Sequence, residues 1–188
     1  MSNWKENVII VDANHLDVTA LNLTVYFERM INRPIPKADL CHWLDCVALD
    51  GGIRQGQNQI QVVFIHDKEK QQLDCFAPGR FSDELNGQAF KDHLGEFELA
   101  SFPVEEVVSK ADFFEQSLEA IIAAESVKTV MVVASMDEYG DQVKKQAQKA
   151  EGKDVVLFSM SPTEERGFKQ ENLGYSLISA LGVKSEEL

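Results

Sequence analysis

The stretch Asn7-Val-Ile-Ile-Val-Asp-Ala-Asn-His15 decides the fold expected for this chain. Four consecutive apolar residues, mostly β-branched, fill Val8 to Val11, which is typical of a strand buried on both faces of a parallel sheet. Asp12 and Asn14 follow directly, and from Leu16 the apolar residues recur at helical spacing. The stretch therefore predicts a central strand that ends in polar side chains and continues into a helix.

Segments typical of strands and helices alternate along the rest of the chain. Further strands are expected at 59–65, 96–102, 129–134 and 154–159, with a short strand at 73–77 forming a hairpin with the first of them and 96–102 near the sheet edge. Helices are expected at 16–33, 39–50, 82–94, 109–124, 138–150 and 173–181. This alternation predicts a three-layer α/β/α, Rossmann-like fold with a mostly parallel central sheet. A chain of 188 residues is expected to form a single domain, 1–188.

The composition narrows the classes of function. The net charge of -13 disfavours tight, non-specific binding of nucleic acid, because such binding normally needs a basic surface. No apolar run approaches the roughly 20 residues of a spanning helix, and the first six residues lack the pattern of a signal peptide. We therefore expect a cytoplasmic protein that is not bound to a membrane. The three cysteines are expected to be reduced.

Three acids carry the candidate chemistry. Asp12 and Asp137 follow predicted buried strands, and Asp112 opens a predicted helix. Each has a structural alternative, because Asp12 suits a turn at a strand end and the other two suit the first turn of a helix. Together they suit a Mg²⁺ or Mn²⁺ site, because these cations bind a few carboxylates and retain water that can attack a phosphodiester.

The segments around these acids resemble a known family. Val8 to Leu16, Lys110 to Ile121 and Val130 to Tyr139 are similar, in that order, to the three acidic motifs of PIN-like and NYN domains. That resemblance implies a Rossmann-like fold and a metal-dependent ribonuclease. It also implies that Asp12, Asp112 and Asp137 are the metal ligands and catalytic residues, with Asn14 orienting the first of them.

The last motif departs from the family pattern. Tyr139 stands where a second acid is usual, and the usual small residue is Met136. Glu138 or Asp141 could supply the lost carboxylate, although neither occupies its position. Ser135 and His15 are further accessory candidates, the histidine because it could contact a phosphate at the same rim.

Two functions follow, and the sequence leaves both open. The first is a Mg²⁺- or Mn²⁺-dependent ribonuclease acting on RNA. The alternative is a catalytically impaired PIN-like module that forms a homodimer or binds a protein partner through an exposed apolar set. That set is expected to contain Trp43, Phe76, Phe81 and Phe90. A nucleotide cofactor is not expected, because no Walker or dinucleotide-binding motif is present.

Overall fold

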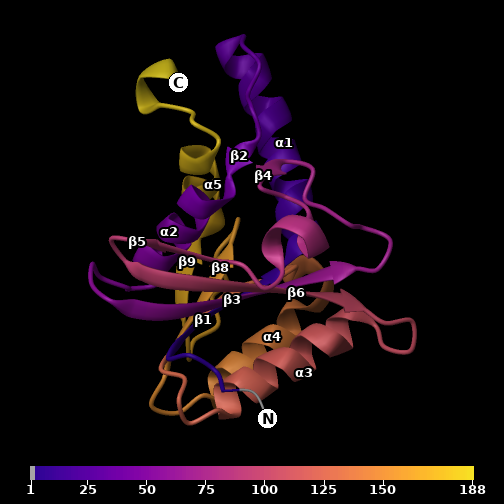
Figure 1. Cartoon of the computed structure of the whole chain (residues 1–188), viewed down its shortest axis with the longest axis vertical. Helices are drawn as coiled ribbons and strands as arrows, with labels where there is room; N and C mark the ends of the chain where they lie inside the picture. The colour runs from indigo at the N-terminus through magenta and orange to yellow at the C-terminus, as the bar shows by residue number, and fades with distance from the viewer. Residues whose placement is uncertain (1–2) are drawn as a thin grey trace.

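A computed structural model describes residues 3–188, which form a seven-stranded sheet covered by helices on both faces (Figure 1). The central strand is β1, Asn7–Asp12, and it lies between β3, Asn58–Asp67, and β7, Thr129–Val133. Both neighbours run parallel to it. The predicted three-layer α/β fold with a mostly parallel sheet is therefore confirmed.

The middle of β1, Val8 to Val11, is apolar because it contributes to two cores. Ile9 and Val11 belong to a core that includes residues of α1, α2 and α5, whereas Val8 and Ile10 belong to a core with α3 and α4. Side chains alternate across a strand, so a strand covered on both faces needs apolar residues at every position. The helices on the first face are α1, Ala13–Ile31, α2, Leu40–Asp50, and α5, Leu173–Ala180. Those on the second are α3, Lys110–Ala123, and α4, Met136–Lys149.

Six parallel strands follow the order of a doubly wound sheet. The sheet runs β5-β6-β3-β1-β7-β8-β9, so its parallel strands, numbered along the chain, lie in the order 3-2-1-4-5-6. The remaining bounds are Gly95–Val104 for β6, Asp154–Ser159 for β8 and Lys169–Asn172 for β9. Strand β5, Ala89–Asp92, pairs antiparallel to β6 and forms one edge. The order in which strands are added therefore reverses beside β1, and the helices α1 and α4 that follow β1 and β7 lie on opposite faces of the sheet.

Several predicted elements are wrong in the region between β3 and α3. The segment 73–77 contains β4, Phe76–Ala77, which pairs parallel with β2, Ala38–Asp39, and not with β3. The predicted helix at 82–94 is a short π-helical turn, Phe81–Leu85, followed by β5. Strand β6 lies next to the edge strand β5, which agrees with its expected position near the sheet edge. Residues 89–92 form a strand because pairing with β6 overrides a weak helical pattern.

The apolar surfaces also differ from expectation. The side chains of Trp43, Phe76 and Phe81 are at most 1% exposed, and Phe90 is half-buried against Phe97 with ring centroids 4.5 Å apart. The predicted exposed set is therefore core. Conversely, α1 leaves apolar side chains on its surface and buries another face, formed by Ala13, Leu16, Ala20 and Phe27.

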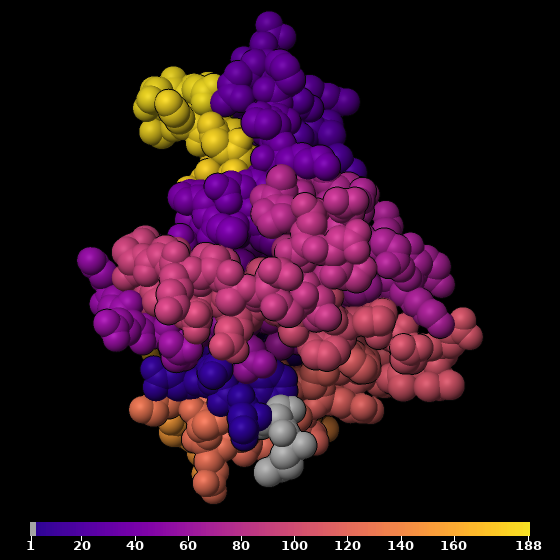
Figure 2. Space-filling view, in the orientation of Figure 1, coloured from indigo at the N-terminus to yellow at the C-terminus, as the bar shows by residue number. Residues whose placement is uncertain are grey.

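One end of the molecule's long axis is formed by two segments that lie far apart in the sequence. The end of α1 and the C-terminal segment project side by side from one end (Figures 1 and 2). Arg33 joins them, donating from Nε and Nη2 to the carboxylate of Glu187 at 2.8 and 2.9 Å. Glu187 lies in a short 3-10 turn, Ser185–Glu187.

Within residues 3–188, none of the helices combines the length and the apolar character required to cross a membrane.

Candidate functional site

A pocket of about 460 Å³ lies at the carboxyl ends of the central strands. His15 at the start of α1, Ser135 and Asp137 after β7, and Ser159 at the end of β8 line it. In doubly wound sheets, ligands bind in the crevice beyond the carboxyl ends of strands where the strand order reverses. The pocket is therefore at the position where this fold offers a binding site.

Asp12, the last residue of β1, is fully buried and does not line this pocket. Its Oδ1 accepts the backbone N–H of His15 at 3.1 Å, so the side chain caps the first turn of α1. Its Oδ2 accepts the hydroxyl of Tyr139 at 2.5 Å. The direct continuation of β1 into α1 places this acid as the helix cap, because a carboxylate satisfies an unpaired N–H there.

Lys110 provides the positive charge beside this acid. Its Nζ lies 3.5 Å from Oδ1 of Asp12 and 3.6 Å from Oδ1 of Asp67, which ends β3. Asn14 fixes that strand end, because its Oδ1 accepts the backbone N–H of Asp67 at 2.7 Å. An ammonium group thus lies between two carboxylates at the carboxyl ends of β1 and β3.

Tyr139 closes the site from the other side. The residue is 3% exposed, and its backbone is not helical although it lies within α4, with φ -142° and ψ 30°. Burial, and then the charge of Asp12, raise the pKa of the Tyr139 hydroxyl well above its usual value, so this hydroxyl stays protonated and donates. Ser135, at the cap position of α4, makes no side-chain cap hydrogen bond.

The other predicted acids are exposed. Asp112 lies in the first turn of α3, where its backbone N–H donates to Oγ of Ser109 at 3.1 Å. Asp137 and Glu138 line the pocket from the first turn of α4. Asp141 is fully exposed, 3.9 Å from Lys144. The structure therefore brings His15, Ser135, Asp137 and Glu138 to one pocket but leaves Asp112 and Asp141 outside its lining.

The side chains around Asp12 do not fit a divalent cation. Its two oxygens are engaged by a hydroxyl, a backbone N–H and an ammonium group, and a cation would have to displace donors that already neutralise the charge. Asp12, Asp112 and Asp137 are also not among the groups of three ligand-type side chains, within residues 3–188, whose atoms lie within 4.8 Å of one another. The Mg²⁺ or Mn²⁺ assignment stays a prediction.

His15 is a titratable group that lines the pocket. Burial lowers its pKa, and the charge of Lys110 acts in the same direction, whereas Asp12, Asp137 and Glu138 oppose the shift. The imidazole is therefore neutral at pH 7 and can accept or donate a hydrogen bond within the pocket.

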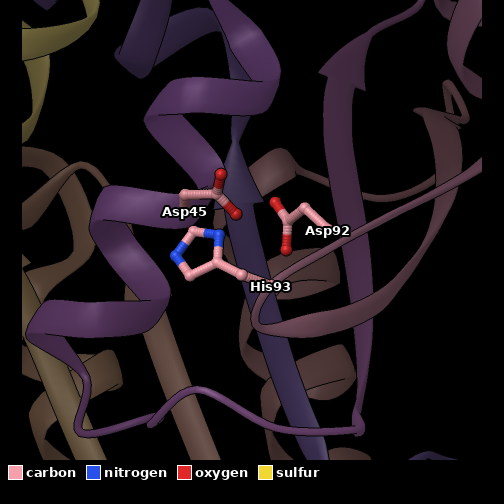
Figure 3. Close-up of side chains that lie close together, drawn as sticks. All are labelled: Asp45, Asp92 and His93. Carbon is pink, nitrogen blue, oxygen red and sulfur yellow. The ribbon is translucent and has the colours of Figure 1, made fainter.

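Sequence reasoning missed two sets of residues. Lys110 and Asp67 complete the surroundings of Asp12, and the signal for them was weak, a single lysine before Asp112 and an acid ending a strand. The second set is Asp45, Asp92 and His93, the one group found within residues 3–188 whose ligand atoms all lie within 4.8 Å (Figure 3). Asp45 lies about 45 residues before the other two, so spacing alone could not reveal it.

The sheet order and the pocket beside β1 define a Rossmann-like α/β protein with a crevice at its topological switch point. The chain belongs to a family described as a family of unknown function, DUF6621, which matches residues 1–188. No curated protein and no solved structure matches the chain.

Proposed function

We propose that the protein is a non-catalytic Rossmann-like module that associates with a second copy of itself through α1. The observation that carries this proposal is an exposed apolar face on that helix. Five side chains, each 41–57% exposed, form the face: Val18, Leu21, Val25, Tyr26 and Met30. Their spacing of three or four residues, with one adjacent pair, places them on one side of a helix. An exposed apolar face of this kind is typical of an interaction surface.

The charges beside this face favour a second copy as the occupant. Exposed Arg29 lies on it near the end of α1, whereas exposed Asp137 and Glu138 lie near its start, in the pocket that Val18 also lines. Val18 and Arg29 are separated by about 16 Å along a helix that rises about 1.5 Å per residue. Antiparallel pairing of two α1 helices about a two-fold axis would place each arginine near the acids of the other copy.

The surroundings of Asp12 support the absence of catalysis. A nuclease of the predicted type needs an open carboxylate that can bind a cation, whereas Asp12 is buried under Tyr139 and Lys110. Tyr139 occupies the sequence position of the missing family acid. Without a metal at this site, a tyrosine can replace that acid and donate a hydrogen bond to Asp12, the residue that the resemblance assigns as the first ligand.

The experiment measures the mass of the purified protein by light scattering over a range of concentrations. We expect a dimer that dissociates on dilution, and a monomer for the folded double variant Leu21→Glu, Val25→Glu, because two charges would be desolvated in the interface. The matched control is Val107→Glu, at a valine that is 92% exposed outside α1, and it should remain dimeric. Arg29→Glu should weaken the dimer, and adding Asp137→Lys should restore it.

The same protein tests the ribonuclease alternative. We expect no cleavage of single-stranded or structured RNA with Mn²⁺ or Mg²⁺. Cleavage that is lost in both Asp12→Asn and the surface variant Asp137→Asn would establish the nuclease and overturn the non-catalytic proposal. A protein that stays monomeric at all concentrations, or a dimer that the α1 double variant leaves intact, would overturn the proposed association.

A further inference from the structure

Two carboxylates face each other at the edge of the molecule far along the sheet from Asp12. Asp45 extends from the middle of α2, and Asp92 ends β5. Figure 3 shows both side chains pointing toward one another, with the ring of His93 beside them. Among residues 3–188, Oδ1 of Asp45 is the one buried side-chain oxygen or nitrogen without a hydrogen-bond partner. A buried oxygen of this kind normally has a partner, and in half-buried Asp45 that partner is either a proton shared with Asp92 or a bound cation.

The turn that carries the other two side chains is held firmly. Oδ1 of Asp92 accepts the backbone N–H of Leu94 at 2.9 Å, and Leu94 is fully buried. The carbonyl of His93 accepts the N–H of Gly56 at 3.0 Å. Gly95 has φ +137°, and a Cβ there would collide with the backbone of Asn58. Asp92 and His93 are therefore presented by a rigid turn, although the His93 ring itself is exposed.

We propose that Asp45, Asp92 and His93 form a binding site for a divalent transition-metal cation such as Zn²⁺. Two carboxylate oxygens and one imidazole nitrogen within 4.8 Å of one another match the donors that Zn²⁺ accepts, with at least one coordination position left for water. The cation neutralises two acids that otherwise repel each other and gives the unpartnered Asp45 oxygen a ligand bond. This site does not depend on the association through α1.

The alternative to a cation is a proton. Burial, followed by the contact with Asp92, raises the pKa of Asp45 to about 7. The metal-free pair is therefore expected to hold a proton near neutral pH, and metal binding should release it. A shared proton and a bound cation give different results on titration with metal, so the two can be separated.

The test is calorimetric titration of the chelator-treated, full-length protein with ZnCl2 at pH 7.5. We expect one site per chain, and His93→Ala and Asp45→Asn should each weaken binding by more than about tenfold. Asp45→Asn has the shape of the native side chain and removes the repulsion, so it should fold, as circular dichroism will verify. In a crystal soaked with Zn²⁺, anomalous scattering should place the ion between the three side chains.

The matched control is His42→Ala. His42 lies on α2 one turn before Cys46, with Nε2 3.7 Å from its Sγ, and is the competing exposed histidine near a thiol. Binding that is unchanged in His42→Ala supports the proposal. Binding that is lost in His42→Ala but kept in His93→Ala overturns the assignment. Absence of binding at millimolar Zn²⁺ also overturns it and leaves the pair as a proton-sharing one.

Discussion

At the scale of single residues, Asp12 is held by donors from three segments of the chain. Lys110 is about 19% exposed in its side chain, whereas Asp12 is fully buried. Removing one partner of a largely buried ion pair leaves the other charge without compensation, at a cost of up to about 3–5 kcal/mol. We predict that Lys110→Met lowers the free energy of unfolding by about 2–3 kcal/mol, because the lysine is partly hydrated. Urea denaturation at pH 7 measures this change.

The control for this prediction is a surface ion pair of the same chemistry. Lys128 lies 3.7 Å from Glu6, with its side chain 76% exposed, and Lys128→Met should change stability by less than about 0.5 kcal/mol. Equal effects of Lys110→Met and Lys128→Met would contradict the role given to Lys110.

The variant Tyr139→Phe should lower the free energy of unfolding by about 1.5–3 kcal/mol in the same urea denaturation, because it removes a hydrogen bond to a buried carboxylate.

The position of Asp12 was predictable and its partners were not. An apolar run that ends in Asp and continues into a helix indicates an acid at the carboxyl edge of a sheet. Lys110 and Tyr139 come from α3 and α4, 98 and 127 residues further along the chain. Only the packing of these helices against the second face brings both side chains to the same carboxylate.

At the scale of elements, α1 has apolar residues on two faces, one buried in the core and one exposed. Phe27 is 6% exposed whereas the adjacent Tyr26 is 57% exposed. We predict that Phe27→Ala lowers the free energy of unfolding by about 3–4 kcal/mol. Tyr26→Ala should lower it by less than about 1 kcal/mol at concentrations where the chain is monomeric. Urea denaturation of the two variants makes the comparison, and a reversed order would show that the faces are assigned incorrectly.

Periodicity located most of the elements but not their neighbours. The long helices and the strands with continuous apolar runs, such as β1 and β7, were predicted because their local pattern agrees with their burial. Strands β2, β4 and β5 are two to four residues long. Such short segments become strands only when a partner strand supplies hydrogen bonds, which local sequence does not encode.

At the scale of the molecule, one sheet joins two cores, and we predict that they unfold together. Trp43 is fully buried in the core with α1, α2 and α5, whereas Trp4 packs against the core with α3 and α4. The variants Trp4→Phe and Trp43→Phe each leave one tryptophan as a fluorescent probe of one core. In each variant, the fluorescence transition should coincide with that of circular dichroism, because β1 contributes alternate residues to both cores. Separate midpoints would show two independently stable layers.

The sequence by itself determined the class of fold, because burial on both faces of a parallel sheet requires runs of apolar residues that alternate with amphipathic helices. It also determined that Asp12 lies at the end of β1 and that Asp137 follows β7. The tertiary structure alone decided that a lysine and a tyrosine engage Asp12, that one apolar face of α1 is left uncovered, and that Asp45 meets Asp92 and His93. The physical reason is that periodicity reports whether a face is apolar, whereas contacts between residues distant in the chain depend on how the helices pack across the sheet.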